Sequence, residues 1–261
     1  MSQLFNVRRF FLLLRLSVLE RPVVIFGACI AALASTAFIY FFFQTIGAYP
    51  PAQYLSFVVG LIGGGCLLAS LVFACFNAEP AGIAYLTVPG SNLEKWLAGL
   101  LIAVAYVLLF LAYYRMLDGF FVDVYHRKLN PLDAQYHVKY AFVGRFAFME
   151  EKELLAFFLN AFCLMLAGSI HFNKAAFIKT ALIIIGIIIA GVMLNTVIAR
   201  FMLPDVARAV PLVNVVIAHE DTESIISLPA RVNRYTGWFV GAVCPAMIIL
   251  LSYLKLKEKE I

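Results

Sequence analysis

Long apolar runs separated by short charged stretches dominate the chain. No Asp, Glu, Lys or Arg occurs in residues 22–78. After Lys95 the next charged residue is Arg115. A helix that crosses a bilayer needs about 20 predominantly apolar residues, so the first run is long enough for two helices. Pro50 and Pro51 divide it, because paired prolines do not fit inside a helix.

The same criterion predicts six membrane-spanning helices. They are expected at residues 23–47, 54–77, 96–114, 154–171, 180–200 and 235–254. The third should end at Arg115, since an arginine at the centre of a bilayer costs about 2.5–3.5 kcal/mol on insertion scales. Pro245 should kink the sixth helix, because a proline removes a backbone hydrogen bond.

Small residues predict close helix packing on two of these helices. The positions are Gly60, Gly63, Gly64 and Gly65 on the second helix, with Gly186 and Ala190 on the fifth. Apart from His171 and Arg200 at their ends, the six spans carry no charged residue or histidine, which argues against a proton-coupled carrier. Interhelical hydrogen bonds are expected from the polar side chains in or near the helices, which are Gln44, Asn160, Asn195 and Thr196.

Three segments are too polar to span. In residues 2–21, Arg8 and Arg15 are seven positions apart and share a helical face, which predicts an amphipathic helix at the membrane surface. Residues 117–152 are rich in aromatic side chains and are expected to form short helices along the outer face. Residues 203–234 are expected to be a second non-spanning outer segment.

The whole chain, residues 1–261, is therefore predicted to be a single transmembrane domain of the all-α class. The one stretch that favours strand lies at 210–218. A hydrophobic content of 64 % and a mean hydropathy of +0.94 are far above those of soluble domains. The five cysteines lie in apolar runs without paired spacing, so neither disulfides nor a metal site follow from them.

The net charge of +5 is distributed unevenly along the chain. With six spans, the segments on the side of the amino terminus hold ten basic and five acidic residues, and the other side holds ten of each. The positive-inside rule makes the first side cytoplasmic, so both termini are expected there. The basic excess thus indicates orientation and contact with membrane lipids, and it requires no nucleic acid.

One charged stretch, residues 79–95, lies in the cytosol in this topology. Pro89 favours a turn, because proline fixes its own backbone and disfavours helix at the residue before it. Ser91 and Glu94 have the capping-box spacing, in which each side chain binds the backbone N–H of the other residue. A helix is therefore predicted to begin at Ser91 and continue into the third span. An ordinary capped loop is the plainer interpretation.

The residues L-T-V-P-G-S-N-L-E-K-W at 86–96 resemble the segment L-x-L-P-x-S-x-x-E-K between the second and third helices of ABC-2 type transporter permeases. Residues 167–180 and 253–261 are similar to bacterial members of that group. Gly90 stands where another small residue is commoner. The resemblance implies a coupling helix that docks on a separate ATPase subunit. Its candidate contacts are Pro80, Tyr85, Leu86, Pro89, Ser91, Asn92, Leu93, Glu94 and Lys95.

The same resemblance implies an exporter subunit in the bacterial inner membrane, paired with a second, identical or homologous permease. The chain contains no G-x-x-x-x-G-K-[ST] sequence, so we expect no cofactor site in it. ATP and Mg²⁺ would be bound by the partner ATPase. A membrane scaffold or sensor that holds a cytosolic partner through the same loop is the alternative.

An intramembrane enzyme is the third class. Glu150 and Glu151 resemble the paired glutamates of CAAX-type membrane proteases, but the downstream arginine of that family is absent, and neither G-x-S-x-G nor H-E-x-x-H occurs. Four side chains of metal-binding types lie near one another in the sequence, but their spacing fits no established metal-site pattern. They are Asp123, His126, Asp133 and His137. We therefore expect no enzymatic activity in this chain.

Overall fold

The structure is a computed structural model. It describes residues 5–73, 87–133, 135–147, 152–172, 174–202, 206–210, 214–219, 222–227 and 229–258. Six helices in this part of the chain are long and apolar enough to cross a membrane, as the hydropathy pattern predicts. They are Pro22–Thr45, Tyr49–Val72, Asn92–Lys128, Lys152–His171, Ala176–Phe201 and Arg234–Glu258.

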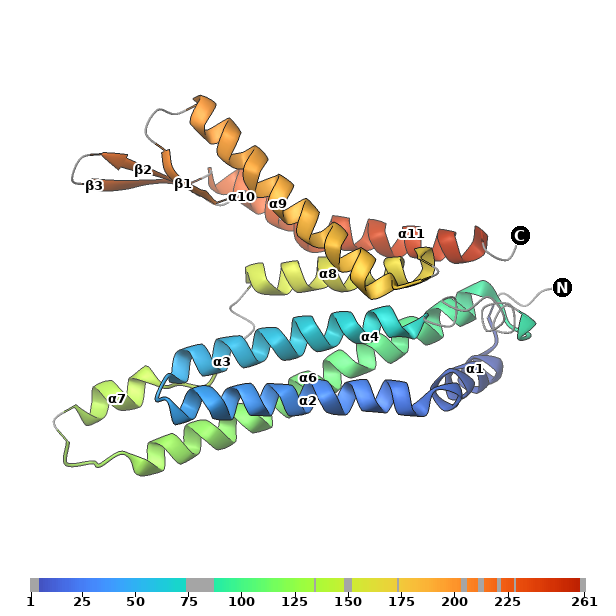
Figure 1. Cartoon of the computed structure of the whole chain (residues 1–261), viewed down its shortest axis with the longest axis horizontal. Helices are drawn as coiled ribbons and strands as arrows, with labels where there is room; N and C mark the ends of the chain where they lie inside the picture. The colour runs from blue at the N-terminus through green and yellow to red at the C-terminus, as the bar shows by residue number, and fades with distance from the viewer. Residues whose placement is uncertain are drawn as a thin grey trace.

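A short helix, α1 (Val7–Glu20), precedes the first of them. The Asn6 side chain caps it by accepting hydrogen bonds from the backbone N–H groups of Arg8 and Arg9. Arg21 leaves the helical conformation (φ −138°, ψ 53°), and α2 (Pro22–Thr45) begins at the next residue. Proline suits this first helical position, because no intrahelical partner is lost there. The chain therefore changes direction between α1 and α2 (Figure 1).

The second long helix has three parts: α3 (Tyr49–Val58), the π-helical turn η1 (Val59–Gly64) and α4 (Gly65–Val72). Pro50 and Pro51 lie in the first turn of α3, where their missing N–H groups break no ladder. They therefore begin a helix, as well as separating two. Gly47, with φ +82°, makes the reversal from α2.

The glycines of this helix allow close packing at three of the four predicted positions. A Cβ atom at Gly60 would lie 2.2 Å from the Phe110 ring, and one at Gly64 would lie 2.0 Å from the Tyr106 hydroxyl. A Cβ at Gly65 would meet the ring of Phe158 at 2.8 Å. A Cβ at Gly63 would have no atom closer than 3.9 Å. Close packing therefore requires glycine at positions 60, 64 and 65 but not at 63.

The third long helix, α6 (Asn92–Lys128), is longer than predicted. It was expected to end at Arg115, but it continues for thirteen residues. At 1.5 Å per residue its 37 residues extend roughly 55 Å, against a hydrocarbon core of about 30 Å. The charge at Arg115 does not interrupt the helix, because its side chain is exposed, and the helix ends only before Pro131.

The first part of the predicted outer segment 117–152 is therefore the end of α6. One short helix, α7 (Tyr136–Phe142), follows, and residues 143–147, which belong to no helix or strand, return to the bundle. The prediction of separate short helices is thus wrong for residues 117–128, which continue α6. Helix α7 is short and separate, as predicted. In Figure 1, α7 lies at the end of the bundle opposite α1.

The helices α8 (Lys152–His171) and α9 (Ala176–Met202) form the next antiparallel pair. Near their junction a Cβ at Gly168 would meet the Thr180 side chain at 2.0 Å, so the pair is close there. Further along, α9 diverges from α8 (Figure 1). Nothing lies within 4 Å of a Cβ built at Gly186, so the predicted small-residue face of α9 is not packed at this position against any residue that the structure describes.

Three strands follow α9: β1 (Val206–Val210), β2 (Asn214–His219) and β3 (Thr222–Ser227). They pair antiparallel in the order β1-β2-β3. The all-α class therefore describes the long helices, and this small sheet is an addition to it. The strand tendency at 210–218 was present in the sequence, but it was too weak alone to predict three paired strands.

The last long helix comprises α10 (Ala230–Trp238), the π-helical turn η3 (Phe239–Val243) and α11 (Cys244–Glu258). The turn η3 lies just before Pro245, the residue at which the sequence predicts a kink. Asn160 of α8 donates to the Val240 carbonyl at 2.8 Å, which is the interhelical bond predicted for it. Thr196 instead binds the Val192 carbonyl of its own helix.

Candidate functional site

The start of α6 has the predicted capping box. The Ser91 hydroxyl accepts a hydrogen bond from the Glu94 N–H (3.3 Å), and Glu94 Oε2 accepts one from the Ser91 N–H (3.0 Å). Together they satisfy two backbone donors that a helix start otherwise leaves unpaired. The prediction that a helix begins here is confirmed.

Glu94 also joins α6 to α1. Arg9 donates to it twice, from Nε to Oε2 at 2.7 Å and from Nη2 to Oε1 at 2.8 Å. The Asn6 N–H donates to Oε1 at 2.6 Å. The Glu94 side chain is fully buried (0 % exposed), so its charge depends on these donors. We call this group of Asn6, Arg9, Ser91 and Glu94 the α6 clamp.

The α6 clamp was missed in the sequence, although one signal pointed to it. Arg9 lies on a different face of α1 from Arg8 and Arg15. If that pair faces the membrane surface, Arg9 faces the rest of the protein. Leu13, one turn further along that face, is buried. A Cβ at Gly90 would lie 2.7 Å from its Cδ1 atom. The unusual glycine at position 90 thus has a physical reason, which is the close approach of α1.

The end of α11 packs on the same helix start. Trp96 Nε1 donates to the Ser252 hydroxyl at 2.9 Å, and its ring meets that of Tyr253 edge to face at 5.9 Å. Leu256, one turn later, is fully buried. Helix α1, the start of α6 and the end of α11 therefore meet at one end of the bundle (Figure 1).

The candidate coupling residues divide by exposure. Pro89 is exposed, and Ser91, Asn92 and Leu93 are half-buried. Glu94 and Lys95 are almost completely buried, with 0 % and 1 % of their surface exposed. These two side chains therefore support the helix start from inside and do not present a surface to another protein. The remaining candidates, Pro80, Tyr85 and Leu86, lie outside the described residues.

A second buried carboxylate lies near the other end of α6. Asp118 is 4 % exposed and accepts hydrogen bonds from Tyr40 Oη (2.9 Å), Gln53 Nε2 (2.8 Å) and the Phe146 N–H (2.9 Å). Gln53 Nε2 also donates to the Gly144 carbonyl at 2.8 Å. Asp118 thus fastens the returning segment 143–147 to α2 and α3. No local pattern predicts this cluster, because the partners of Asp118 come from three distant segments.

The possible metal ligands have other partners. His126 Nε2 donates to the Val143 carbonyl at 2.9 Å, and its ring stacks on Tyr140 at 3.9 Å. Asp133 pairs with the Lys139 ammonium, which holds the pKa of that carboxyl below its ordinary value. No three His, Cys, Asp or Glu side chains in the described part of the chain are grouped to hold a metal ion. His126 therefore serves to position the loop after α7.

The paired glutamates Glu150 and Glu151 lie outside the described residues, so the structure adds nothing on the protease-like pattern. No protein-family model, curated protein or solved structure matches the chain. The functional interpretation therefore depends on the geometry at the two ends of α6 and on the sequence at 86–96.

Proposed function

We propose that the chain is the membrane-spanning permease subunit of an ATP-driven ABC-2 type transporter, acting as an exporter in a bacterial inner membrane. A separate ATPase subunit would dock on residues 79–95, and a second permease would complete the assembly. ATP and Mg²⁺ would be bound by the ATPase. This proposal combines the sequence resemblance at 86–96 with one structural observation, which is the α6 clamp.

The clamp supports the proposal because it makes the start of α6 rigid. A helix start held only by water would fray when a partner pushed on the preceding loop. Here the Ser91 cap and the Arg9–Glu94 pair fix it to α1, and Trp96 fixes it to α11. A force applied at the exposed Pro89 would reach the long helix without being absorbed by local unwinding.

The same arrangement assigns roles to the candidate residues. Pro89 and the residues before it would provide the contact surface, while Ser91 and Glu94 would transmit the movement. Shifting a two-state equilibrium from 1:99 to 99:1 takes about 5.5 kcal/mol of differential binding. The hydrogen bonds that the Glu94 carboxylate accepts contribute about 1.5–3 kcal/mol each, with less from the partly exposed Arg9, so their sum is of the same order as this free energy.

The test is a pull-down of the tagged full chain from native membranes in mild detergent, followed by mass spectrometry. We expect a P-loop ATPase to be recovered with the native chain. Glu94→Gln should reduce that recovery, because it removes the charge that holds Arg9 and so loosens the helix start that positions the contact surface at Pro89. Asp118→Asn is the matched control, since it makes the same chemical change at the other end of the same helix.

Two results would contradict the proposal. Absence of any ATPase from the native chain, under conditions that keep other transporters intact, would favour the scaffold or sensor, which would bring a different cytosolic partner. Equal loss of the ATPase in Glu94→Gln and Asp118→Asn would show that the clamp has no special role. Detergent size-exclusion profiles of both variants establish that they remain folded.

A further inference from the structure

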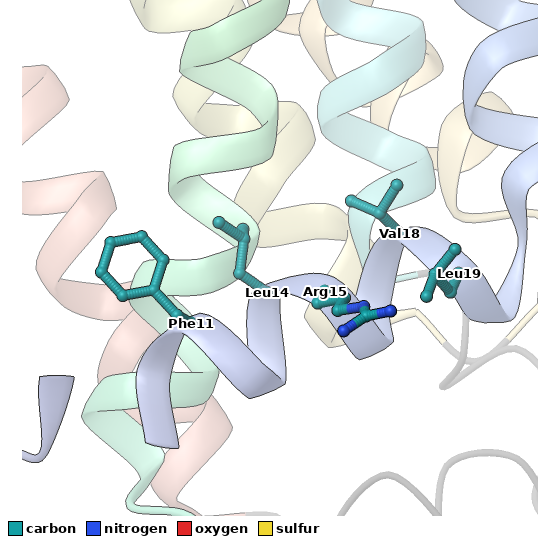
Figure 2. Close-up of a pocket in the computed structure, with 5 residues that line it drawn as sticks. All are labelled: Phe11, Leu14, Arg15, Val18 and Leu19. Atoms are coloured by element: carbon teal, nitrogen blue, oxygen red, sulfur yellow. The ribbon is translucent and has the colours of Figure 1, made fainter. Parts of the chain in front are cut away.

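The outward face of α1 has a composition unlike its inward face. Arg9 and Leu13 point to α6, whereas Phe11 and Leu19 are 60 % and 59 % exposed. Figure 2 shows Phe11, Leu14, Val18 and Leu19 standing on one side of the helix with the guanidinium of Arg15 among them. These five residues line a hollow built from α1 alone.

The charge on this face is uniformly positive. Arg8 and Arg15 are both exposed, and neither forms an ion pair with any residue that the structure describes. Glu20 is eleven residues from Arg9 and lies within about 20° of it around the helix, so the acid belongs to the inward side. The outward face therefore combines large apolar side chains with two cations and no acid.

The position of α1 brings this face to the level of a membrane surface. Only Arg21 separates α1 from α2, which is long and apolar enough to span. A helix that turns away from the end of such a span after one residue lies near the boundary between headgroups and acyl chains. At that level large apolar side chains enter the lipid, and arginine side chains extend to the headgroups.

We propose that this face of α1 binds anionic phospholipid headgroups. Arg8 and Arg15 are roughly 10 Å apart along the helix axis, so each pairs with the phosphate of a separate lipid. Phe11, Val18 and Leu19 enter the acyl boundary beside them. Arginine suits this role, because its fork of N–H donors matches phosphate oxygens.

The lipid site and the α6 clamp are on opposite faces of one helix. An anionic surface that holds Arg8 and Arg15 therefore also holds Arg9 against Glu94. This inference does not depend on the ATPase proposal, since it concerns only α1 and the bilayer. A chain that recruits no ATPase would still carry the lipid site.

The experiment uses the full chain in vesicles made of equal parts of phosphatidylcholine and phosphatidylglycerol. The protein is extracted in mild detergent, and mass spectrometry gives the ratio of the two lipids retained. We expect phosphatidylglycerol to be enriched on the native chain. One arginine near an anionic surface contributes about fivefold in affinity, so replacing two should weaken the site by about 30-fold at low salt.

The test variant is Arg8→Gln with Arg15→Gln, and Arg8→Lys with Arg15→Lys should keep most of the enrichment. The matched control is Arg231→Gln with Arg234→Gln, which removes two exposed arginines at the other end of the bundle. Enrichment that survives in the Gln variant, or is lost equally in the control, would overturn the proposal. The proposal would also be overturned if high salt left the phosphatidylglycerol enrichment on the native chain unchanged. This measurement needs no variant.

Discussion

Two buried carboxylates of α6, Glu94 in its first turn and Asp118 ten residues before its end, are stabilised in different ways. Glu94 is held by the guanidinium of Arg9 together with two backbone N–H groups. Asp118 is held by a phenol, a carboxamide and a backbone N–H, which are all neutral donors. The two residues are 24 positions apart, or roughly 36 Å along the helix, which exceeds a hydrocarbon core of about 30 Å.

The difference shows what each end is built to do. An ion pair with two-point geometry fixes the relative position of two helices, so Glu94 holds α1 against α6. Neutral donors hold a carboxylate through dipoles, and those around Asp118 come from a side chain of α2, a side chain of α3 and the loop backbone. Asp118 therefore closes one end of the bundle, whereas Glu94 connects the other end to a neighbouring element.

The largest expected effect is that of Arg9→Ala. It leaves the Glu94 carboxylate buried without its cation, and breaking a buried pair in this way costs about 3–5 kcal/mol. We expect a smaller loss than that of a fully buried pair, because the Arg9 side chain is itself 35 % exposed and Glu94 keeps two backbone N–H donors. Thermal unfolding in detergent measures the loss of stability.

The control for this prediction is Glu94→Gln, which should cost less than Arg9→Ala. Arg9 can reach water when its partner is neutral, whereas Glu94 cannot. Arg9→Ala with Glu94→Gln should therefore be more stable than Arg9→Ala alone. A double variant that is less stable than Arg9→Ala would show that the charge of Glu94 is not the source of the cost.

Asp118→Asn should have a smaller and more local effect. Its oxygen can still accept from Tyr40 and Gln53, but its NH₂ group faces the Phe146 N–H, so one buried donor loses its acceptor. An unsatisfied buried group costs about 1–3 kcal/mol. Hydrogen exchange should rise at residues 143–147 and stay unchanged at 91–96. An equal rise in exchange at residues 143–147 and 91–96 would mean that Asp118 stabilises the whole bundle.

The smallest effect expected is a difference in salt dependence. Counter-ions reach the partly exposed Arg9, so high salt should reduce the stability difference between the native chain and Glu94→Gln by less than about 1 kcal/mol. The difference between the native chain and Asp118→Asn should not change, because its donors are neutral. Parallel unfolding curves at low and high salt measure both. Equal salt dependence of the two differences would remove the distinction between the two ends.

Local signals in the sequence were reliable where the physics is local. Six long apolar runs predicted six long helices, and the three-residue spacing of Ser91 and Glu94 predicted the cap. The partners of Glu94 and Asp118 were not predictable in this way. Arg9 is 85 residues from Glu94 and Tyr40 is 78 from Asp118, so only the folded chain brings them together.

The end of α6 shows a different kind of error. Arg115 marked the end of the apolar run correctly, but an apolar run and a helix do not have to end together. Outside hydrocarbon an exposed arginine is compatible with a helix, and the next proline, Pro131, proved the better marker. The sheet at 206–227 was missed because three strands of five or six residues stabilise one another only once paired.

The widened turn η1 places a particular demand on the helix that faces it. The Gly60 carbonyl in that turn accepts a hydrogen bond from the Tyr106 hydroxyl at 2.9 Å. In hydrocarbon no water replaces a missing donor, so a backbone oxygen must be satisfied by the protein. Tyrosine and phenylalanine have nearly the same shape, yet at position 106 only tyrosine carries the hydroxyl that donates to this carbonyl.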